Sequence, residues 1–385
     1  MNSEWKKVKL SEITTIIGDG LHGTPQYDEN GEYYFINGNN LQDGKIVIKE
    51  DTKRVSFEEY SKYKKDLNDR TIFVSINGTI GNIGTYNNEK VILGKSACYF
   101  NVDKNNDTDF IQYVVTNKKF KDYIQHNATG TTIKNVSLKL MRDYEFILPP
   151  IRVQKKIASV LKSLDSKISC NNQINDNLGN LLQVIYKQHF ACKNIELLDG
   201  CLADICEYSR DRIAVSYLSL DNYYSTENML PGKGGAVQAT SLPTINQTTK
   251  CKGGDVLISN IRPYFKKIVY CYEECGCSTD VLCFTPKKLK YSAFLFSTLY
   301  ADRFFEYMVA GSKGTKMPRG DKQQIMTYPV QKPSDEELSS FNEIAKPILL
   351  NIENNKTENL RLSVLRDTLL PLLMSGELDI SEISI

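Results

Sequence analysis

Loops rich in small and basic residues are the parts of this sequence that could carry chemistry. The stretch GSKGTKMPR at 311–319 combines small residues with Lys313, Lys316 and Arg319. Glycines let backbone amides approach a phosphate group, and the basic side chains supply positive charge. Asparagine and arginine in neighbouring loops could read base edges, because asparagine pairs with adenine and arginine with guanine. The stretch therefore predicts contact with a nucleic acid, and the alternative is an ordinary solvated loop.

Loops of this kind recur in both halves of the chain, which favours binding over simple solvation. They lie at 19–25, 36–40, 75–81 and 129–134, and again at 209–212, 259–267 and 311–319. Asn260 and Arg262 follow a predicted strand and are expected to read bases, although Arg262 could instead pack on Tyr264 or pair with an acidic neighbour. The lysines at 266, 267, 313 and 316 are expected to hold phosphates. The residues predicted to contact DNA are His22, Thr24, Asn37, Asn39, Ser75, Asn77, Thr79, Lys95, Thr131, Lys134, Arg210, Asn260, Arg262, Tyr264, Lys266, Lys267, Lys313, Thr315, Lys316 and Arg319.

Motifs of the common enzyme classes are absent from the sequence. It contains no G-x-x-x-x-G-K-[ST] phosphate loop, no G-x-S-x-G elbow and no H-E-x-x-H pair. The D/N-P-P-Y/F tetrapeptide of adenine methyltransferases is also missing, because the two prolines at 149–150 are flanked by Leu148 and Ile151. The glycines at 18–20 and 81–84 lack a full dinucleotide fingerprint and are expected in loops. The sequence thus predicts a chain without a catalytic centre.

The cysteines and histidines do not predict a metal site. The densest group, Cys271, Cys275, Cys277 and Cys283, lacks the paired C-x2-C spacing of zinc sites, and the three histidines are scattered. The N-terminus has no apolar signal segment, so the thiols should stay reduced. We expect them to be half-buried in strands.

Length and composition indicate a globular protein of two domains. The 385 residues suit two domains of roughly 150 residues with connecting elements. No run of about 18 apolar residues occurs, so no membrane span is predicted and the expected compartment is the cytoplasm. The net charge of +2 argues against a binder that relies on bulk charge, but not against one with its basic residues on one face.

The chain repeats itself at a constant shift in residue number, the repeat offset. This repeat offset aligns Gly130-Thr131 with Gly314-Thr315. Only the start of each half needs a slightly longer offset, which aligns residues 10–13 with 202–205. The repeat offset also aligns Ser75 with Ser259, Phe110 with Phe294, Tyr144 with Tyr328, Pro149 with Pro333, Ile168 with Ile352 and Leu178 with Leu362. The same order of elements is therefore expected twice.

Each half is expected to begin as a mixed α and β domain. Segments rich in β-branched and aromatic residues predict strands at 33–37, 71–76, 90–93 and 97–102, and at 255–260, 268–272 and 281–285. A short helix is predicted at 109–125 and again at 291–310. A loop rich in Gly and Thr follows each helix, and then a strand ending in proline.

A long helix is expected to close each half. Between 152 and 189 apolar residues recur in steps of three and four, which is the seam of a coiled coil. Asn171 and Asn175 interrupt this seam, and Asn355 and Asn359 recur at the aligned places in the second half. Because a buried asparagine fixes register, the two helices are predicted to pack on each other in defined register. The alternative is that these are ordinary solvated asparagines.

Three features of the second helix depart from the first. Pro347 removes a donor and crowds the preceding turn, so we expect a kink or break there. Arg366 places a charge in the seam. Pro371 and Gly376 are expected to end the helix.

Several stretches together resemble the specificity subunits of type I restriction-modification systems. GDGLHGTPQYDENGEYYFINGNNL at 18–41 looks like the start of one recognition-domain subtype, and SLDNYYSTENMLPGKGG at 219–235 with DVLISNIRPYFKKI at 255–268 looks like another. PPIRVQKKIASVLKSLDSKI at 149–168 and LLPLLMSGEL at 369–378 look like parts of the helical regions. The resemblance covers essentially the whole chain.

This resemblance implies an α+β architecture with two globular target-recognition domains that alternate with two long helices paired as an antiparallel coiled coil. The expected boundaries are 1–150 and 191–333 for the recognition domains, and 151–190 and 334–385 for the helical spacers. The family's function implies that each domain reads one half of a split DNA target while the helices set the spacing and dock two modification subunits. S-adenosylmethionine, ATP and Mg are expected on those methyltransferase subunits and on two motor-nuclease restriction subunits, and no cofactor is expected on this chain.

Other functions remain open at this point. The chain could serve a fused nuclease-methyltransferase partner, or it could be a coiled-coil scaffold whose globular domains bind proteins. A fused enzyme would need a cofactor pocket or metal cluster that the sequence does not indicate. Since the two recognition domains differ strongly in their middle segments, the expected DNA target is asymmetric.

Overall fold

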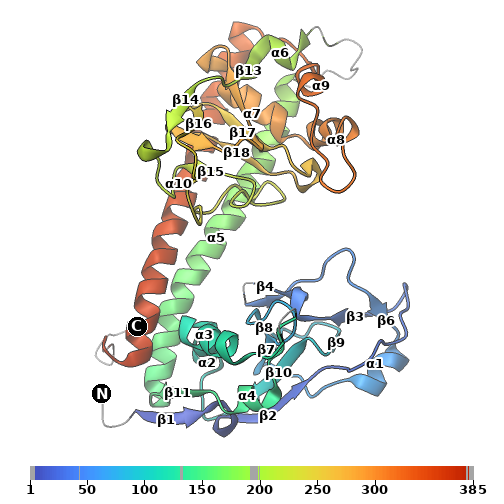
Figure 1. Ribbon diagram of the computed structural model, residues 1–385, viewed down its shortest axis with the longest axis vertical. Helices are drawn as coiled ribbons and strands as arrows, with labels where there is room; N and C mark the ends of the chain where they lie inside the picture. The colour runs from blue at the N-terminus through green and yellow to red at the C-terminus, as the bar shows by residue number, and fades with distance from the viewer. Residues whose placement is uncertain are drawn as a thin grey trace. The chain divides into compact units, whose positions relative to one another are not determined.

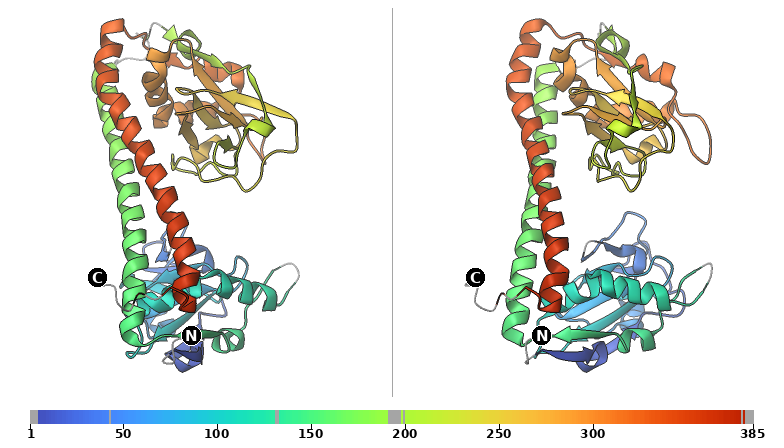
Figure 2. Two further views of the ribbon diagram at one scale, coloured as in Figure 1. Left: turned by 90° about the vertical axis from the view of Figure 1, so that its left-hand side faces the viewer. Right: turned by 60° about the vertical axis from the view of Figure 1, so that its left-hand side comes forward.

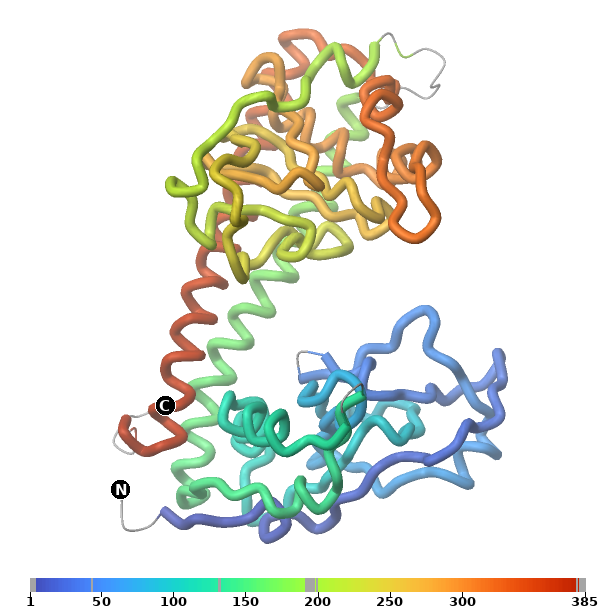
Figure 3. The backbone as a smooth tube through the Cα atoms, viewed as in Figure 1, coloured from blue at the N-terminus to red at the C-terminus, as the bar shows by residue number. Residues whose placement is uncertain are grey.

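The computed structural model describes residues 5–378 and 380, apart from residues 43, 131–132, 191–197 and 199. The chain divides into two compact units. Unit 1 comprises residues 1–169 and 358–385, and unit 2 comprises residues 170–357. Two long helices, α5 (Ile151–Phe190) and α10 (Asp335–Ser375), each contribute one part to unit 1 and the other part to unit 2. Figure 3 traces how the chain leaves unit 1 through α5 and returns to it through the end of α10.

Unit 1 is built on the four-stranded antiparallel sheet β2-β10-β7-β8. A second sheet, β6-β3-β9, and the pairs β4-β5 and β1-β11 complete its strands (Figure 1). The elements are β1 (Lys6–Lys9), η1 (Leu10–Glu12), β2 (Thr14–Asp19), β3 (Tyr33–Ile36), η2 (Gly38–Asn40), β4 (Leu41–Gln42), β5 (Lys45–Ile46), β6 (Arg54–Val55), α1 (Phe57–Tyr63), β7 (Thr71–Ser75), β8 (Ile83–Thr85), β9 (Val91–Leu93), β10 (Ala97–Val102), α2 (Thr108–Thr116), α3 (Lys118–Asn127), α4 (Leu138–Arg142) and β11 (Glu145–Leu148).

Unit 2 repeats this plan with the sheet β13-β20-β17-β18 and the pair β12-β21. Its other sheet, β14-β16-β19-β15, has no counterpart of the same order among the described strands of unit 1. The elements are β12 (Gly200–Cys201), α6 (Leu202–Ile205), β13 (Cys206–Tyr208), β14 (Arg212–Ala214), η4 (Val215–Tyr217), β15 (Tyr223–Tyr224), β16 (Gln247–Cys251), β17 (Val256–Ser259), η5 (Pro263–Phe265), β18 (Ile268–Tyr270), β19 (Cys275–Cys277), β20 (Val281–Pro286), η6 (Leu289–Tyr291), α7 (Ser292–Tyr300), α8 (Asp302–Ala310), α9 (Lys322–Met326) and β21 (Pro329–Val330).

The repeat predicted from the sequence extends to individual hydrogen bonds. The Leu10 amide donates to the Tyr144 carbonyl at 2.9 Å, and the aligned Leu202 amide donates to the Tyr328 carbonyl at 2.9 Å. In both units the helices after the sheet bury a phenylalanine completely, Phe110 in α2 and its aligned residue in α7. The predicted mixed α and β class with two long helices is confirmed.

Each short helix that was predicted as one piece is two helices in the structure. Asn117 adopts an extended backbone between α2 and α3, and its side chain accepts a hydrogen bond from the Lys119 amide to cap α3. Ala301, aligned with Asn117, is extended between α7 and α8 in the same way. The prediction missed these breaks because the apolar periodicity continues across a single extended residue.

The predicted break at Pro347 is wrong, since α10 continues through it for 41 residues. Ala345, Ile348 and Leu349 on either side of Pro347 are buried in the core of unit 2, and that burial outweighs the roughly 3 kcal/mol that a proline costs inside a helix. Pro371 also lies within α10 and does not end it. Gly376 does, because it adopts a positive φ of 73° directly after the last helical residue.

The two long helices contact each other within each unit, where they lie side by side (Figure 2). In unit 2, the Asn355 side-chain amide donates to Asn175 Oδ1 at 2.9 Å, and Asn175 Nδ2 donates to the Ile352 carbonyl at 3.3 Å. In unit 1, Arg366 Nη1 donates to Asp165 Oδ1 at 2.7 Å. The predicted seam arginine is therefore neutralised by an acid on the facing helix.

The main core of each unit includes parts of both long helices. In unit 1, Leu161 of α5 and Leu373 of α10 are buried in the same cluster as Phe100 of the sheet. In unit 2, Leu182 of α5 and Phe341 of α10 are buried with Phe284 of the sheet. Among the described residues, no helix combines the length and the apolar character that crossing a membrane requires.

Candidate nucleic-acid interface

Two of the predicted binding loops of unit 2 lie against each other at one edge of its main sheet. The first loop follows β17, whose last residue, Ser259, pairs with the first residue of β20. The second loop closes on itself, since Lys313 and Arg319 exchange two backbone hydrogen bonds of 2.9 Å. The loops are joined by a bridge between Ile261 and Arg319 and by the Arg262 amide, which donates to the Pro318 carbonyl at 2.8 Å. Backbone pairing thus fixes the residues of both loops together.

Unit 1 contains the same junction, built from aligned residues. Thr129 and Asn135 exchange two backbone hydrogen bonds, Asn77 bridges to Asn135, and the Gly78 amide donates to the Lys134 carbonyl at 3.1 Å. Each of these bonds has its partner in unit 2 at the repeat offset. Both units therefore present a pair of joined loops at the same edge of the same sheet.

Arg262 occupies a strained position in the unit 2 junction. Its φ of 50° lies in the left-handed region, where the aligned residue of unit 1 is Gly78 with a φ of 76°. Its buried Nε has no hydrogen-bond partner among the described residues, and the same holds for Oδ1 of Asn260, whose exposed fraction is 6%. A non-glycine residue in this conformation with unpaired buried polar atoms is the pattern found at ligand sites. This observation singles out the two residues that the sequence predicted to read bases.

Most of the basic side chains near this junction are already paired with acids. Asp302 accepts from Lys266 at 2.7 Å and from Lys233 at 2.9 Å, and these two ammonium groups lower the Asp302 pKa to about 2. Asp321 pairs with Lys313 and Asp280 with Arg319. Lys266 and Lys313 were predicted to hold phosphates and Arg319 to contact DNA, and each has a competing carboxylate.

Other predicted residues of unit 2 are accessible. Thr315, Lys316 and Arg210 are exposed, and Tyr264 is 50% exposed at the loop surface. Lys267 donates to the Thr226 carbonyl at 2.6 Å, and burial lowers the pKa of its ammonium group.

The predicted residues of unit 1 fall into two groups. His22, Thr24, Asn39, Thr79, Lys95 and Lys134 are exposed, and Asn77 is half-buried at the loop junction. His22 contacts Asp19 at 2.6 Å and Lys134 donates to Gln125 at 3.3 Å. Ser75 and Asn37 instead serve the fold, because Ser75 is fully buried and accepts from the Asn82 amide, while Asn37 accepts from Ser96. We therefore do not include Ser75 and Asn37 among the proposed DNA contacts. Thr131, which was also predicted to contact DNA, lies outside the described residues.

Sequence reasoning missed an apolar pair at the tips of the second loops. Ile133 is 62% exposed in unit 1, and Met317, its aligned residue in unit 2, is 45% exposed. The ring of Phe265, which is 40% exposed, lies 4.7 Å from that of Tyr264. The repeat offset contained the signal, since it aligns the two apolar tips, but neither side chain carries the charge or the polar groups on which the predicted contacts rest.

The cysteines of unit 2 are more deeply buried than expected. Cys251, Cys271, Cys275, Cys277 and Cys283 are all at most 3% exposed and form one cluster with Leu257. Unit 1 has larger side chains at two aligned positions, Phe73 for Leu257 and Tyr99 for Cys283. The thiols therefore fill a small core. Within the described part of the chain, no three His, Cys, Asp or Glu side chains are placed to hold a metal ion.

Comparison with known proteins gives a family match for part of the sequence and a likeness in fold for nearly the whole chain. Residues 2–180 match the family described as type I restriction modification DNA specificity domain. The S subunit of a type I restriction-modification system from M. genitalium is 17% identical, with 99% of this chain and 98% of that chain covered and a TM-score of 0.57. This likeness shows a shared fold. The HsdS subunit from Thermoanaerobacter tengcongensis is 12% identical, with 98% of each chain covered and a TM-score of 0.37.

Proposed function

We propose that this chain, whose residues 2–180 match the family described as type I restriction modification DNA specificity domain, is the DNA-reading specificity subunit of a type I complex. In this proposal each unit reads one half of a bipartite target through its pair of joined loops. The observation that carries the proposal is the bond-by-bond repetition of the loop junction in both units. A duplicated scaffold with duplicated loops suits a protein that contacts two separate DNA segments.

Different side chains on the two junctions support an asymmetric target. Unit 1 has Asn77 and Gly78 where unit 2 has Ile261 and Arg262, and the tips carry Ile133 and Met317. Hydrogen bonds to base edges depend on side-chain type, so equal placement with unequal side chains gives two different half-sites. Asn260 and Arg262 are the proposed readers in unit 2.

The proposed partners are two modification subunits and two restriction subunits. Exposed apolar side chains on the long helices support docking there, namely Ile174, Leu181 and Val184 on α5 and Leu360, Val364 and Leu365 on α10. Exposed apolar rows on otherwise polar helices mark interaction surfaces. Adenine methylation with S-adenosylmethionine, and DNA cleavage with ATP and Mg, are proposed for those partners, and this chain is proposed to be non-catalytic.

Methylome sequencing of a host that carries the complex tests the proposal. We expect one split motif with an adenine methylated in each half and a gap of fixed length. Loop residues 260–266 and 313–319 of this chain can be exchanged for those of a relative. The methylated motif of a host with this variant should then change in one half only. Methylation at unsplit sites, or a motif that does not respond to the exchange, would refute the proposal.

A further inference from the structure

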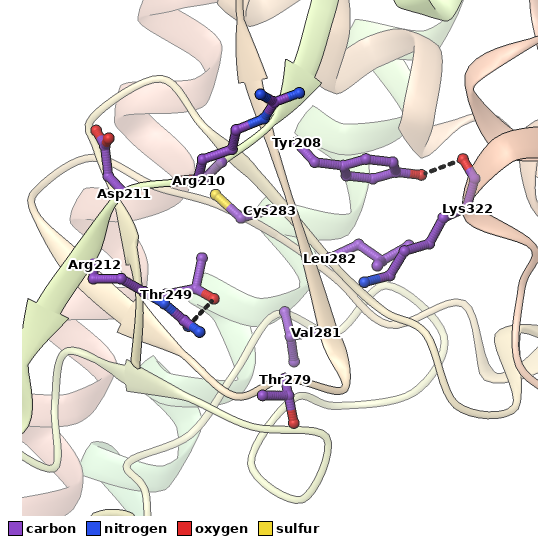
Figure 4. Close-up of a pocket in the computed structure, with 11 residues that line it drawn as sticks. Tyr208, Arg210, Asp211, Arg212, Thr249, Thr279, Val281, Leu282, Cys283 and Lys322 are labelled. Carbon is purple, nitrogen blue, oxygen red and sulfur yellow. Dashed lines mark hydrogen bonds between the residues drawn. The ribbon is translucent and has the colours of Figure 1, made fainter. Parts of the chain in front are cut away.

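A surface cavity of about 300 Å³ opens in unit 2 beside the loop junction. Its walls come from the segment between β13 and β14, from β16, from the start of β20 and from α9 (Figure 4). Val281, Leu282 and Cys283 of β20 contribute to its lining, together with the Thr249 and Thr279 side chains. The hydroxyl of Tyr208 donates to the Lys322 carbonyl at 3.0 Å, which holds α9 against β13. The cavity is therefore walled by hydrogen-bonded elements.

Three cations line this cavity, and none of them forms an ion pair with a carboxylate among the described residues. Neither Arg210 nor Lys322 has an ion pair in the part of the chain that the structure describes, and Arg212 donates only a long hydrogen bond of 3.4 Å to Thr249. Figure 4 shows the Arg212 and Lys322 side chains pointing toward each other from opposite sides. The acid in the described lining, Asp211, pairs with Lys252 outside it at 2.6 Å.

Three basic residues of the neighbouring loops differ from these cations. Lys266, Lys313 and Arg319 each have a carboxylate partner within 3.2 Å, so their charge is largely compensated. Like charges around a cavity repel one another, and an anion placed between them removes that repulsion. An arginine fork with hydroxyl groups beside it is suited to a phosphate.

The cavity also adjoins the proposed base-reading residues. Asp280 lies between the lining residues Thr279 and Val281, its carbonyl accepts from the Asn260 amide at 2.8 Å, and its carboxylate pairs with Arg319. An anion in the cavity would therefore lie at the same edge of the sheet as the loop that contains Arg262.

We propose that Arg210, Arg212 and Lys322 bind one phosphate group of the DNA backbone, next to the half-site read by unit 2. This assignment rests on the proposed function, because a backbone phosphate is the anion that a DNA-reading loop brings to this edge. Unit 1 has no equivalent, since the aligned residues are Gly18, Gly20 and Leu138. The contact is thus specific to one half of the target, and it positions the reading loop without itself reading sequence.

The test compares two double variants of the full chain in its complex. R212A/K322A removes two charges from the cavity, and K287A/K288A removes two exposed charges at the other end of β20. Binding to a duplex with the target is measured over a range of salt, and each backbone phosphate is replaced in turn by a neutral methylphosphonate. Thermal unfolding confirms that both variants fold, and Arg212→Lys serves as a milder variant that keeps the charge.

For R212A/K322A we expect about tenfold to hundredfold weaker binding, an unchanged motif and a salt slope lower by about 0.9, which is one phosphate. At one position of the duplex, the methylphosphonate should weaken DNA binding by the wild type but should not weaken binding by this variant further. R212K and K287A/K288A should keep the wild-type slope. An unchanged slope and methylphosphonate pattern in R212A/K322A would overturn the assignment, and so would a changed motif.

Free phosphate compounds are the other source of this anion. Titration of ATP or inorganic phosphate into the complex without DNA should show no saturable binding that R212A/K322A abolishes, and such binding would overturn the DNA assignment. If the wild type itself shows no preference for the target duplex, the proposed function fails, whatever the cavity binds.

Discussion

Arg262 stands in a backbone conformation that favours glycine, and the aligned position of unit 1 is Gly78. A non-glycine residue there costs about 1–2 kcal/mol, so stability alone would select glycine. The arginine therefore has a role that stability does not provide, and its unpaired Nε indicates a partner that the described part of the chain lacks.

Replacing Arg262 should separate recognition from folding. We expect Arg262→Ala to relax one half-site by about 1–3 kcal/mol of base discrimination and to leave the other half-site unchanged. Arg262→Gly should have the same effect on recognition without lowering the melting temperature, because glycine tolerates the positive φ. Selection of bound sequences from a random pool, with thermal unfolding of both variants, provides the measurement. A wild-type motif at both halves would exclude direct readout by Arg262.

Lys316 and Lys313 form a matched pair on one loop. Lys316 is exposed without an ion pair in the described part of the chain, whereas Lys313 pairs with Asp321 and lowers the pKa of that carboxyl group. We expect Lys316→Ala to weaken binding to all targets alike and to lower the salt slope by about 0.9. Lys313→Ala should have a smaller effect, because the aspartate already compensates its charge. Equal slopes for the two variants would contradict this division.

At the scale of elements, Arg366 and Asp165 join the two long helices in unit 1. Tyr113 of α2 also donates to Asp165, at 2.6 Å, so the acid links the helix pair to the domain. The aligned position of Arg366 in unit 2 is Leu182, which is buried and apolar. The two helices are therefore joined by an ion pair in unit 1 and by apolar packing in unit 2. This difference disfavours exchange of the helix contacts between the two units.

Loss of Arg366 should destabilise unit 1. Among the described residues, Arg366→Ala leaves Asp165 with Tyr113 as its donor, and we expect the free energy of unfolding to fall by about 1–2 kcal/mol, a value that allows for the partial exposure of both side chains. The double variant D165L/R366L should recover much of that loss, since an apolar seam needs no partner. Denaturant unfolding measures both variants, and a double variant no more stable than Arg366→Ala would show that an apolar seam does not replace the ion pair.

Patterns local in sequence predicted much of the fold. Heptad spacing predicted helices close to α5 and α10, and the repeat offset aligned the loops of the two halves, although it did not predict that the loops within each unit join. Contacts between distant residues were not predictable in this way. The pairing of Lys266 with Asp302 joins residues 36 positions apart, and nothing near Lys266 in sequence indicates that its charge is compensated. The cation cavity was missed for the same reason, because it combines Arg212 with Lys322.

At the scale of the whole molecule, each long helix passes from one unit into the other. The unit boundaries fall after Ser169 on α5 and after Thr357 on α10. The contact of Asn175 with Asn355 belongs to unit 2, and that of Asp165 with Arg366 belongs to unit 1. Extra residues at the two boundaries would leave both contacts intact.

Insertion of four helical residues at both boundaries, near Asn171 and Asn355, should lengthen the gap in the DNA target. Four residues add about 6 Å to each helix, which corresponds to one or two base pairs at roughly 3.4 Å each. Insertion into α5 alone should instead destabilise the protein, because the contacts on the two sides of the boundary could not form together in one register. Methylome sequencing reads the gap directly. The two half-sites should stay as they are, and an unchanged gap in the double insertion would show that the helices do not set the spacing.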